Sequence, residues 1–214
     1  MRGAILFDLD GTLIDSTEAI LECFARSFTQ FGYEVPPSKE IVRLIGHPLD
    51  FMFAHLGVKE DVQRFVAAYK ECYRQVSAQK TKLLPGAKEA VVEASAFAKL
   101  AVVTTKTGLY SKELLGHLGL LEFFEVVIGR EDVINPKPHP ETVLKALHHI
   151  GVQPRRSWMI GDTCLDMDAA KRAGVGGVAV LCGYGTKEQL QRCTKHVEAN
   201  AKDAVALARR FLDR

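Results

Sequence analysis

The sequence predicts an α/β fold in which a parallel sheet is packed by helices and an all-helical segment is inserted early in the chain. Two observations predict the sheet: short apolar runs recur along the 214 residues, and helical patterns separate them. The runs are continuously apolar rather than alternating, which is typical of strands buried on both faces of a parallel sheet. A third observation, a stretch of roughly 65 residues without a convincing strand, predicts the insertion.

The first strand is expected over Ala4–Phe7. The other apolar runs that we expect to form strands are Leu100–Val103, Val126–Ile128, Trp158–Ile160 and Val178–Leu181. The helices expected between strands, from their composition and leucine spacing, are Gly86–Ala98, Leu109–Leu118, Glu141–Ile150 and Leu165–Ala173. Strands that alternate with helices in this way predict βαβ units, and therefore a parallel sheet.

The early helical segment contains three amphipathic patterns, over Ala19–Phe31, Leu49–Leu56 and Val62–Ala78. Pro36-Pro37 and Gly46-His47-Pro48 separate them. A block of this size is too long to be a simple connection between strands. We therefore expect a helical subdomain over residues 16–83, inserted into a core made of residues 1–15 and 84–214.

Composition places the chain among ordinary soluble globular proteins, with 47% hydrophobic and 25% charged residues. Lys and Arg total 28 against 26 Asp and Glu, and the two signs are mixed along the chain. This balance predicts neither a nucleic-acid surface nor a polybasic membrane surface. The N-terminal apolar run is too short for a signal segment or a membrane span. We expect a cytoplasmic protein, and the sequence makes no prediction of its oligomeric state.

The five cysteines are scattered and show neither a CxxC pair nor the spacing of a zinc site. They are Cys23, Cys72, Cys164, Cys182 and Cys193. An odd and scattered set of this kind predicts free thiols in a reducing compartment.

Polar side chains gather after the predicted strands. The first strand is followed by Asp8, Asp10 and Gly11, and the second by Thr104-Thr105-Lys106. The loop after the third strand contains Lys137. The fourth strand is followed by Asp162 and Asp166, and the fifth by Cys182-Gly183-Tyr184-Gly185. Ligands of parallel α/β sheets bind outside the carboxyl ends of the strands, so these groups should meet at one edge. The last of these groups is a weak signal that reads as a plain turn.

This residue set has a chemical logic. Clustered carboxylates repel one another unless a metal or protons neutralise them. Oxygen ligands suit Mg²⁺, which also bridges to phosphate. A lysine would balance further phosphate charge, threonine hydroxyls and turn amides would donate to phosphate oxygens, and a carboxylate can be the nucleophile that forms an aspartyl-phosphate.

Four ordered motifs carry a family resemblance. DLDGTLIDS at residues 8–16, VVTTK at 102–106, KPHP at 137–140 and GDTCLDMDAAKRAG at 161–174 resemble the motifs of the haloacid dehalogenase superfamily. The helical insertion after the first motif is similar to that of its capped phosphatases, most closely the phosphoglycolate phosphatase-like branch. The resemblance covers nearly the whole chain and implies a Rossmann-like, doubly wound parallel sheet with a helical cap.

The resemblance also implies roles for individual residues. Asp8 matches the nucleophile, and Asp10 matches the general acid and base. The Asp8 side chain, the Asp10 backbone carbonyl and Asp162 match the Mg²⁺ ligands, with Asp166 either a further ligand or a group that supports one. The phosphate-binding positions are matched by Gly11, Thr104, Thr105 and Lys137. IGHPL at residues 45–49 resembles the substrate-specificity loop of capped relatives, which makes His47 a candidate contact to the substrate.

Simpler interpretations stand beside these roles. Taken alone, Asp8 to Gly11 could be a strand-end turn, and Lys137 a solvated loop lysine. Asp162 and Asp166 could cap the helix that follows. Thr105 could be a turn residue, and His47 could lie on a charged helix surface with Lys39 and Arg43.

The function that we predict is a Mg²⁺-dependent phosphomonoesterase that acts on a small phosphorylated metabolite, with phosphoglycolate as the first candidate. Pyrophosphate, sugar phosphates and nucleotides are alternative substrates within the same family. A phosphohexomutase shares the core motifs. A haloacid dehalogenase is disfavoured by Asp10, and a phosphonate hydrolase would need a cap lysine such as Lys39. A non-catalytic binding protein is least expected, because it should have lost at least one motif residue.

Overall fold

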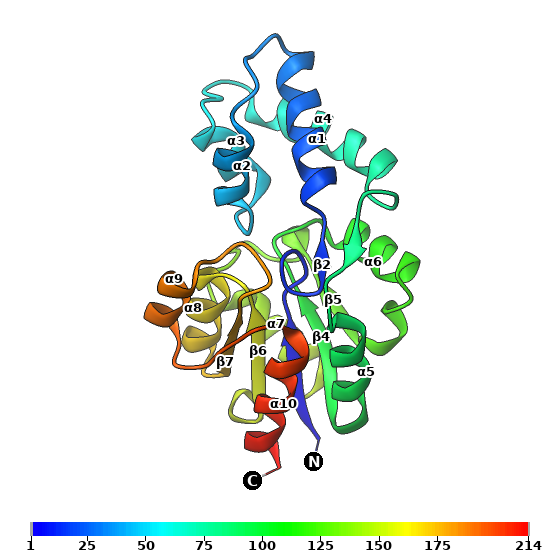
Figure 1. Cartoon of the computed structure of the whole chain (residues 1–214), viewed down its shortest axis with the longest axis vertical. Helices are drawn as coiled ribbons and strands as arrows, with labels where there is room; N and C mark the ends of the chain where they lie inside the picture. Colours follow the sequence, from blue (N-terminus) through cyan, green and yellow to red (C-terminus); the bar gives the residue numbers. More distant parts are fainter. Residues whose placement is uncertain (1, 214) are drawn as a thin grey trace.

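The computed structural model describes residues 2–213 and confirms the predicted α/β fold (Figure 1). Over these residues the main sheet has six parallel strands in the order β5-β4-β1-β6-β7-β8. Helices cover both faces of this sheet, and a group of four helices stands beyond one end of it (Figure 1).

Each of the five predicted apolar runs forms a strand of the sheet, and only Leu181 at the end of the last run lies outside its strand. The strands of the sheet are β1 (Gly3–Phe7), β4 (Ala98–Val103), β5 (Val126–Ile128), β6 (Ser157–Gly161), β7 (Gly176–Val180) and β8 (Val197–Glu198). The helices of this part are α5 (Ala87–Phe97), α6 (Gly108–His117), α7 (Glu141–Ile150), α8 (Cys164–Ala173), α9 (Lys187–Cys193) and α10 (Ala201–Leu212). Short 3₁₀ turns lie at Leu121–Phe123, Arg130–Asp132 and Pro154–Arg156.

Burial on both faces explains the continuously apolar strands. Ile5 and Phe7 of β1 belong to the core that includes α5 and α10, whereas Ala4 and Leu6 belong to the core that includes α7 and α8. All four side chains are fully buried. Successive strand residues point to opposite faces, so a strand covered on both faces has no position that favours a polar side chain.

The strand register brings the predicted site residues to one edge. Phe7, the last residue of β1, pairs with Val102 of β4 on one side and Ile160 of β6 on the other. The backbone N–H of Asp8 still donates to Ile160 O, at 2.9 Å. The three strands therefore end at nearly the same level, and the loops that follow them start side by side.

The four helices beyond the sheet form what we call the helical unit. It comprises α1 (Thr17–Gln30), α2 (Ser38–Leu44), α3 (Leu49–His55) and α4 (Val62–Val76), and the short antiparallel pair β2 (Ile14–Asp15) and β3 (Lys82–Leu83) lies where the chain enters and leaves it. Aromatic rings fill its centre, among them Phe24, Phe28 and Phe53. The unit stands over the carboxyl ends of the strands (Figure 1).

Several elements, most of them short, were not predicted. β3 lies at the end of the stretch where no strand was expected, and β8, α2, α9 and α10 were also missed. Two-residue strands carry no periodicity, and α2 has only seven residues, directly after Pro36-Pro37. α10 did carry a signal: Asn200 caps it by accepting from the Asp203 N–H at 3.1 Å, and Ala204, Val205 and Ala208 form a buried face. None of the described helices is both long and apolar enough to cross a membrane.

The prediction of free thiols is wrong for four of the five cysteines. A disulfide joins Cys23 of α1 to Cys72 of α4, and another joins Cys164 of α8 to Cys193 of α9. The Cα atoms are 5.5 Å apart in the first pair and 5.7 Å in the second. The partners are 49 and 29 residues apart in sequence, so only the packing of the helices could reveal that they meet. Cys182 is the free cysteine of the described chain.

The two disulfides predict the result of a thiol titration. Protein unfolded in denaturant without reductant should expose one reactive thiol per chain, from Cys182, and five after reduction, because four sulfurs are held in the two bonds. A chromogenic disulfide reagent measures both numbers. Five reactive thiols before reduction would contradict the pairing, and a Cys182→Ala variant is the control that should reduce each count by one.

Candidate active site

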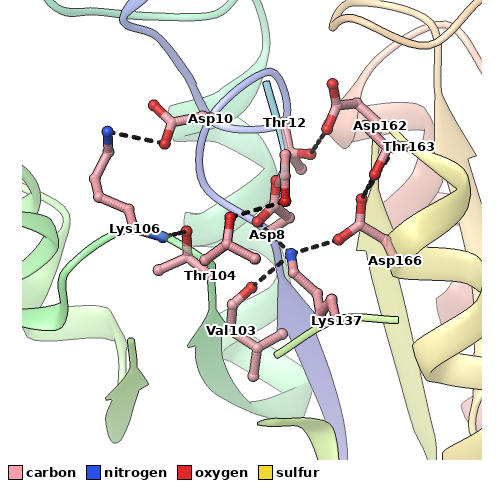
Figure 2. A network of polar contacts seen from close by, with 12 residues as sticks. Asp8, Asp10, Thr12, Val103, Thr104, Lys106, Lys137, Asp162, Thr163 and Asp166 are labelled. Carbon is pink, nitrogen blue, oxygen red and sulfur yellow. Dashed lines mark hydrogen bonds and ion pairs between the residues drawn. The ribbon is translucent and has the colours of Figure 1, made fainter. Parts of the chain in front are cut away.

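Asp8 lies at the centre of the cluster at the sheet edge (Figure 2). It directly follows β1, and only 5% of the residue is exposed. One carboxylate oxygen accepts a hydrogen bond from Lys137 Nζ at 2.6 Å. Burial raises the pKa of Asp8 from 3.8 to about 7, even though the neighbouring Lys137 opposes that rise.

Lys137 connects three segments of the chain. Its Nζ donates to Asp8, to Asp166 Oδ1 at 2.5 Å and to the backbone oxygen of Val103 at 3.2 Å. An ammonium group has three donors, so all of them are used. The two carboxylates raise its pKa, although burial opposes this, and the group therefore stays charged. The interpretation of Lys137 as a solvated loop residue is wrong, because it is 3% exposed.

Three buried carboxylates face one another at this edge. Asp8, Asp162 and Asp166 each present an oxygen within 4.8 Å of the others. Lys137 supplies one positive charge against these three. Burial raises the pKa of Asp162 well above its usual range, and the charges on Asp8 and Asp166 raise it further. A divalent cation would supply the missing positive charge, and oxygen donors suit a hard cation such as Mg²⁺, so these residues fit a metal site.

Asp162 is positioned by close packing of glycines. Its Oδ2 accepts the Tyr184 N–H at 2.7 Å, and Thr12 Oγ1 donates to its Oδ1 at 3.4 Å. A Cβ on Gly11 or on Gly183 would overlap Oδ2 of this carboxylate. The turn after β7, a weak signal in the sequence, is therefore part of the site. Its signal was two glycines around a tyrosine beyond a strand end.

Asp166 does two things at once. Its Oδ2 accepts from the N–H of Thr163 at 3.1 Å and from the hydroxyl of Thr163 at 2.7 Å, which caps the start of α8. Its other oxygen binds Lys137. The capping interpretation of this residue is therefore correct, but incomplete. Asp162 precedes the capping residue and makes its contacts elsewhere.

Asp10 points away from Asp8, toward Lys106 (Figure 2). Its Oδ2 lies 3.0 Å from Lys106 Nζ, and its Oδ1 accepts a hydrogen bond from the Ser16 hydroxyl, where the chain enters α1. The two carboxylates are only two residues apart but have different surroundings. Asp8 faces the buried carboxylate cluster, and Asp10 faces the cavity next to the helical unit.

The predicted phosphate-binding residues are distributed around this centre. Thr104 is buried, and its hydroxyl accepts the Lys106 N–H at 3.2 Å. Thr105 donates from its hydroxyl to the backbone oxygen of Gly46 in the helical unit, at 2.9 Å. The Gly11 amide donates to Ile14 O at 2.8 Å, in a turn whose φ of 82° favours glycine. Their contacts to phosphate stay predictions.

A cavity of about 50 Å³ lies between the helical unit and the sheet edge, beside Asp10. Aromatic side chains form much of its wall, from Phe24, Tyr69, Tyr73 and Tyr110. His47 also lines it, with its ring stacked on Phe51 at 4.3 Å between centroids. Burial, and the nearby His55, lower the pKa of His47, so it is neutral at physiological pH.

The sequence and the fold are both similar to those of known proteins. The sequence matches the family of haloacid dehalogenase-like hydrolases over residues 5–180. It is 35% identical over 185 residues to a pyrophosphatase, PpaX, from Halalkalibacterium halodurans, covering 86% of this chain and 84% of that one. It is 31% identical over 182 residues to a phosphoglycolate phosphatase from Aquifex aeolicus, covering 84% and 85%. A haloacid dehalogenase-like protein from Streptococcus pneumoniae superimposes with a TM-score of 0.86 at 28% identity, covering 96% and 98%.

The carboxylate cluster predicts metal binding that strengthens with pH. The raised pKa of Asp8 means that its contribution to metal-free stability is full below pH 3.8 and is lost as pH rises through about 7. A divalent cation binds the ionised form and competes with protons. The melting temperature should therefore rise more on addition of Mg²⁺ at pH 8 than at pH 5, with ~2.7 kcal/mol of stabilisation at 100 times the Kd.

Thermal melts at the two pH values, with matched variants, test this. Asp162→Asn should lose the Mg²⁺ effect at pH 8. Asp168→Asn, on the same helix but outside the cluster, should keep it. An equal or larger shift at pH 5 would contradict a site built from these carboxylates.

The glycine packing predicts the effect of one added methyl group. Gly183→Ala should displace Asp162 and weaken Mg²⁺ binding by ~10- to 100-fold, the range for changes that disturb groups supporting a metal ligand. Calorimetric titration measures the affinity. Gly116→Ala is the control, because its Cβ would meet nothing closer than 3.9 Å. Unchanged affinity in Gly183→Ala would contradict this, because it would mean that the loop at Gly183 shifts and Asp162 stays in place.

Proposed function

The chain belongs to the haloacid dehalogenase-like hydrolases and is a phosphatase of that family, and from this premise we propose that it is a Mg²⁺-dependent phosphomonoesterase that uses Asp8 as its nucleophile. The observation that carries the proposal is the position of Asp8: it is buried, bound to Lys137, and faces Asp162 and Asp166 at the carboxyl end of β1. An anionic nucleophile needs positive charge around it before it can approach an anionic phosphate. Lys137 supplies one such charge, and a cation held by the carboxylates would supply the rest.

The proposed reaction has two steps. The Asp8 carboxylate attacks the phosphorus atom, the bond from phosphorus to the leaving oxygen breaks, and Asp10 gives its proton to that oxygen. Asp10, now ionised, then takes a proton from a water molecule, whose oxygen attacks the phosphorus of the aspartyl-phosphate. The bond to Asp8 breaks, phosphate leaves, and both aspartates return to their starting states.

The other site residues hold the phosphoryl group in this proposal. The Asp8 carboxylate, the Asp10 carbonyl and Asp162 would hold the Mg²⁺ ion, which neutralises phosphate charge when bound. Thr104 would bind a phosphate oxygen, and so would Lys137, by exchanging one of its three present hydrogen bonds for one to phosphate; their burial at the edge supports this role. Gly11 and Thr105 remain candidates for further contacts, and Asp166 for a ligand or a support to Lys137.

The helical unit supplies the remaining part of the proposal. We assign residues 16–83 as a cap on a catalytic core of residues 1–15 and 84–214. A cap that closes over the substrate excludes water until the attack has occurred. The hydrogen bond from Thr105 to Gly46 O and the cavity beside Asp10 support this assignment. His47 lines that cavity and stays a candidate contact to the substrate.

Phosphoglycolate is our first candidate substrate, supported by the likeness to the Aquifex aeolicus enzyme. Pyrophosphate is the second, favoured by 35% identity to the Halalkalibacterium halodurans enzyme. Sugar phosphates, nucleotides and a phosphohexomutase reaction use the same core chemistry and serve as comparisons in the assay.

Phosphate release tests the proposal directly. Wild-type protein should release phosphate from at least one compound of a panel of phosphoglycolate, pyrophosphate, hexose phosphates and mononucleotides, and only with Mg²⁺ present. Asp8→Asn should lower the rate by at least ~10⁴-fold, because the variant lacks the carboxylate that accepts the phosphoryl group in the proposed first step. Asp168→Asn is the control and should keep the wild-type rate.

Two results would overturn the proposal. Release that continues in Asp8→Asn would place the nucleophile elsewhere. Absence of release from every compound, in protein that binds Mg²⁺ by calorimetry, would favour a mutase or a binding protein. Isomerisation of a hexose phosphate without net release would identify the mutase.

A further inference from the structure

The proposed chemistry does not use a second buried lysine. The Lys106 side chain is 10% exposed, and its Nζ lies 3.0 Å from Asp10 Oδ2 and 3.0 Å from the Tyr73 hydroxyl. It also lies 4.2 Å from the centroid of the Tyr73 ring. Lys106 lines the cavity beside Asp10. Lys106 lies in the VVTTK motif at residues 102–106.

The backbone of Lys106 is fixed on both sides. Its N–H donates to the Thr104 hydroxyl at 3.2 Å, and its carbonyl accepts from the Arg130 N–H at 2.9 Å. The lysine is therefore held by the same loop that carries a predicted phosphate contact. Its ammonium lies on the opposite side of Asp10 from the Asp8 cluster (Figure 2).

The Lys106 ammonium group has three donors, and its contacts to Asp10 and to the Tyr73 hydroxyl use two of them. Asp10 is the only carboxylate among these contacts, and the Tyr73 hydroxyl and ring are neutral. Because Lys106 lines the cavity, its third donor is available to a group bound there. In the proposed reaction the part of the substrate that leaves lies beside Asp10, which protonates it, and would therefore lie within reach of Lys106.

Lys106 is the cation of the cavity wall that contacts Asp10. Of the residues that line it, Lys70 and Lys106 are the lysines, and His47 is neutral at physiological pH. Lys70 is only half-buried on α4, whereas Lys106 contacts Asp10 directly. A volume of about 50 Å³ suits a compact leaving group.

We propose that Lys106 is a specificity-determining residue that binds a negative charge on the leaving group of the substrate. This inference rests on the proposed function and narrows it to phosphate compounds whose leaving group is itself anionic. The carboxylate of phosphoglycolate and the second phosphate of pyrophosphate share this chemistry. Hexose phosphates and mononucleotides do not, because their leaving groups are neutral.

The test compares anionic and neutral leaving groups of similar size. The kcat/KM of wild type, Lys106→Met and Lys70→Met is measured on phosphoglycolate, pyrophosphate and ethyl phosphate, whose leaving group has no charge. Lys106→Met should lower the ratio of anionic to neutral substrate by about 10- to 150-fold, the range for losing one hydrogen bond to a charged group. Lys70→Met should leave the ratio unchanged.

The same ratio separates this role from a positioning role. If Lys106 only orients Asp10, all three substrates slow by the same factor in Lys106→Met, and the proposal is wrong. It is also wrong if Lys70→Met is the variant that collapses the ratio. Should Lys106→Met fold poorly, Lys106→Gln retains polar contact with Asp10 and Tyr73 but removes the charge, and the same fall in the ratio is expected. In wild type, comparing kcat/KM for phosphoglycolate and pyrophosphate shows whether Lys106 prefers a carboxylate or a phosphate on the leaving group.

A binding measurement keeps this result independent of turnover. Asp8→Asn, titrated by calorimetry in the presence of Mg²⁺, should bind phosphoglycolate or pyrophosphate more tightly than ethyl phosphate. Adding Lys106→Met should remove that preference. A preference that persists in the double variant overturns the role of Lys106 whether or not wild type hydrolyses the compounds. Absence of hydrolysis by wild type, with the preference intact, overturns only the phosphatase chemistry.

Discussion

The site depends on one buried ammonium group, that of Lys137. It contacts Asp8 after β1, Asp166 on α8 and the end of β4 at Val103. A buried charge is stable only with partners of good geometry. The parallel register supplies that geometry, because β1, β4 and β6 end at the same level. The strand register therefore determines where Lys137 and the carboxylates meet. Their hydrogen bonds in turn require the strands to end at matching positions.

One lysine does not balance the cluster, and this imbalance is informative. Asp162 approaches the other carboxylates because Gly11 and Gly183 leave room for it and the Tyr184 amide binds it. A third buried carboxylate lowers the stability of the folded protein, so stability alone does not account for its position here. Burial raises the pKa values of Asp8 and Asp162, and the charge on Asp166 raises both further; a bound divalent cation would oppose these shifts.

Much of this could be predicted from sequence, because hydrophobic pattern and strand ends carry it. β5 and α7 have the predicted bounds, and the predicted site aspartates and Lys137 lie at one edge. The rest depends on contacts between segments far apart in the chain. No local pattern shows that Tyr184 meets Asp162, that Thr105 meets Gly46, or that Cys23 meets Cys72. The helix α10 is different, since its cap and buried face were visible in the sequence.

The two aspartates after β1 divide the site into two regions. Asp8 faces Lys137 and the other carboxylates, the set that we propose binds the phosphoryl group. Asp10 faces Lys106, Tyr73 and the helical unit, the set that we propose contacts the leaving group. Because the walls of the second region come largely from the inserted helices and one short loop, they can change without disturbing the first. Under this proposal, the separation would let proteins with the same core act on different phosphate substrates, in keeping with the different names of the relatives of this chain.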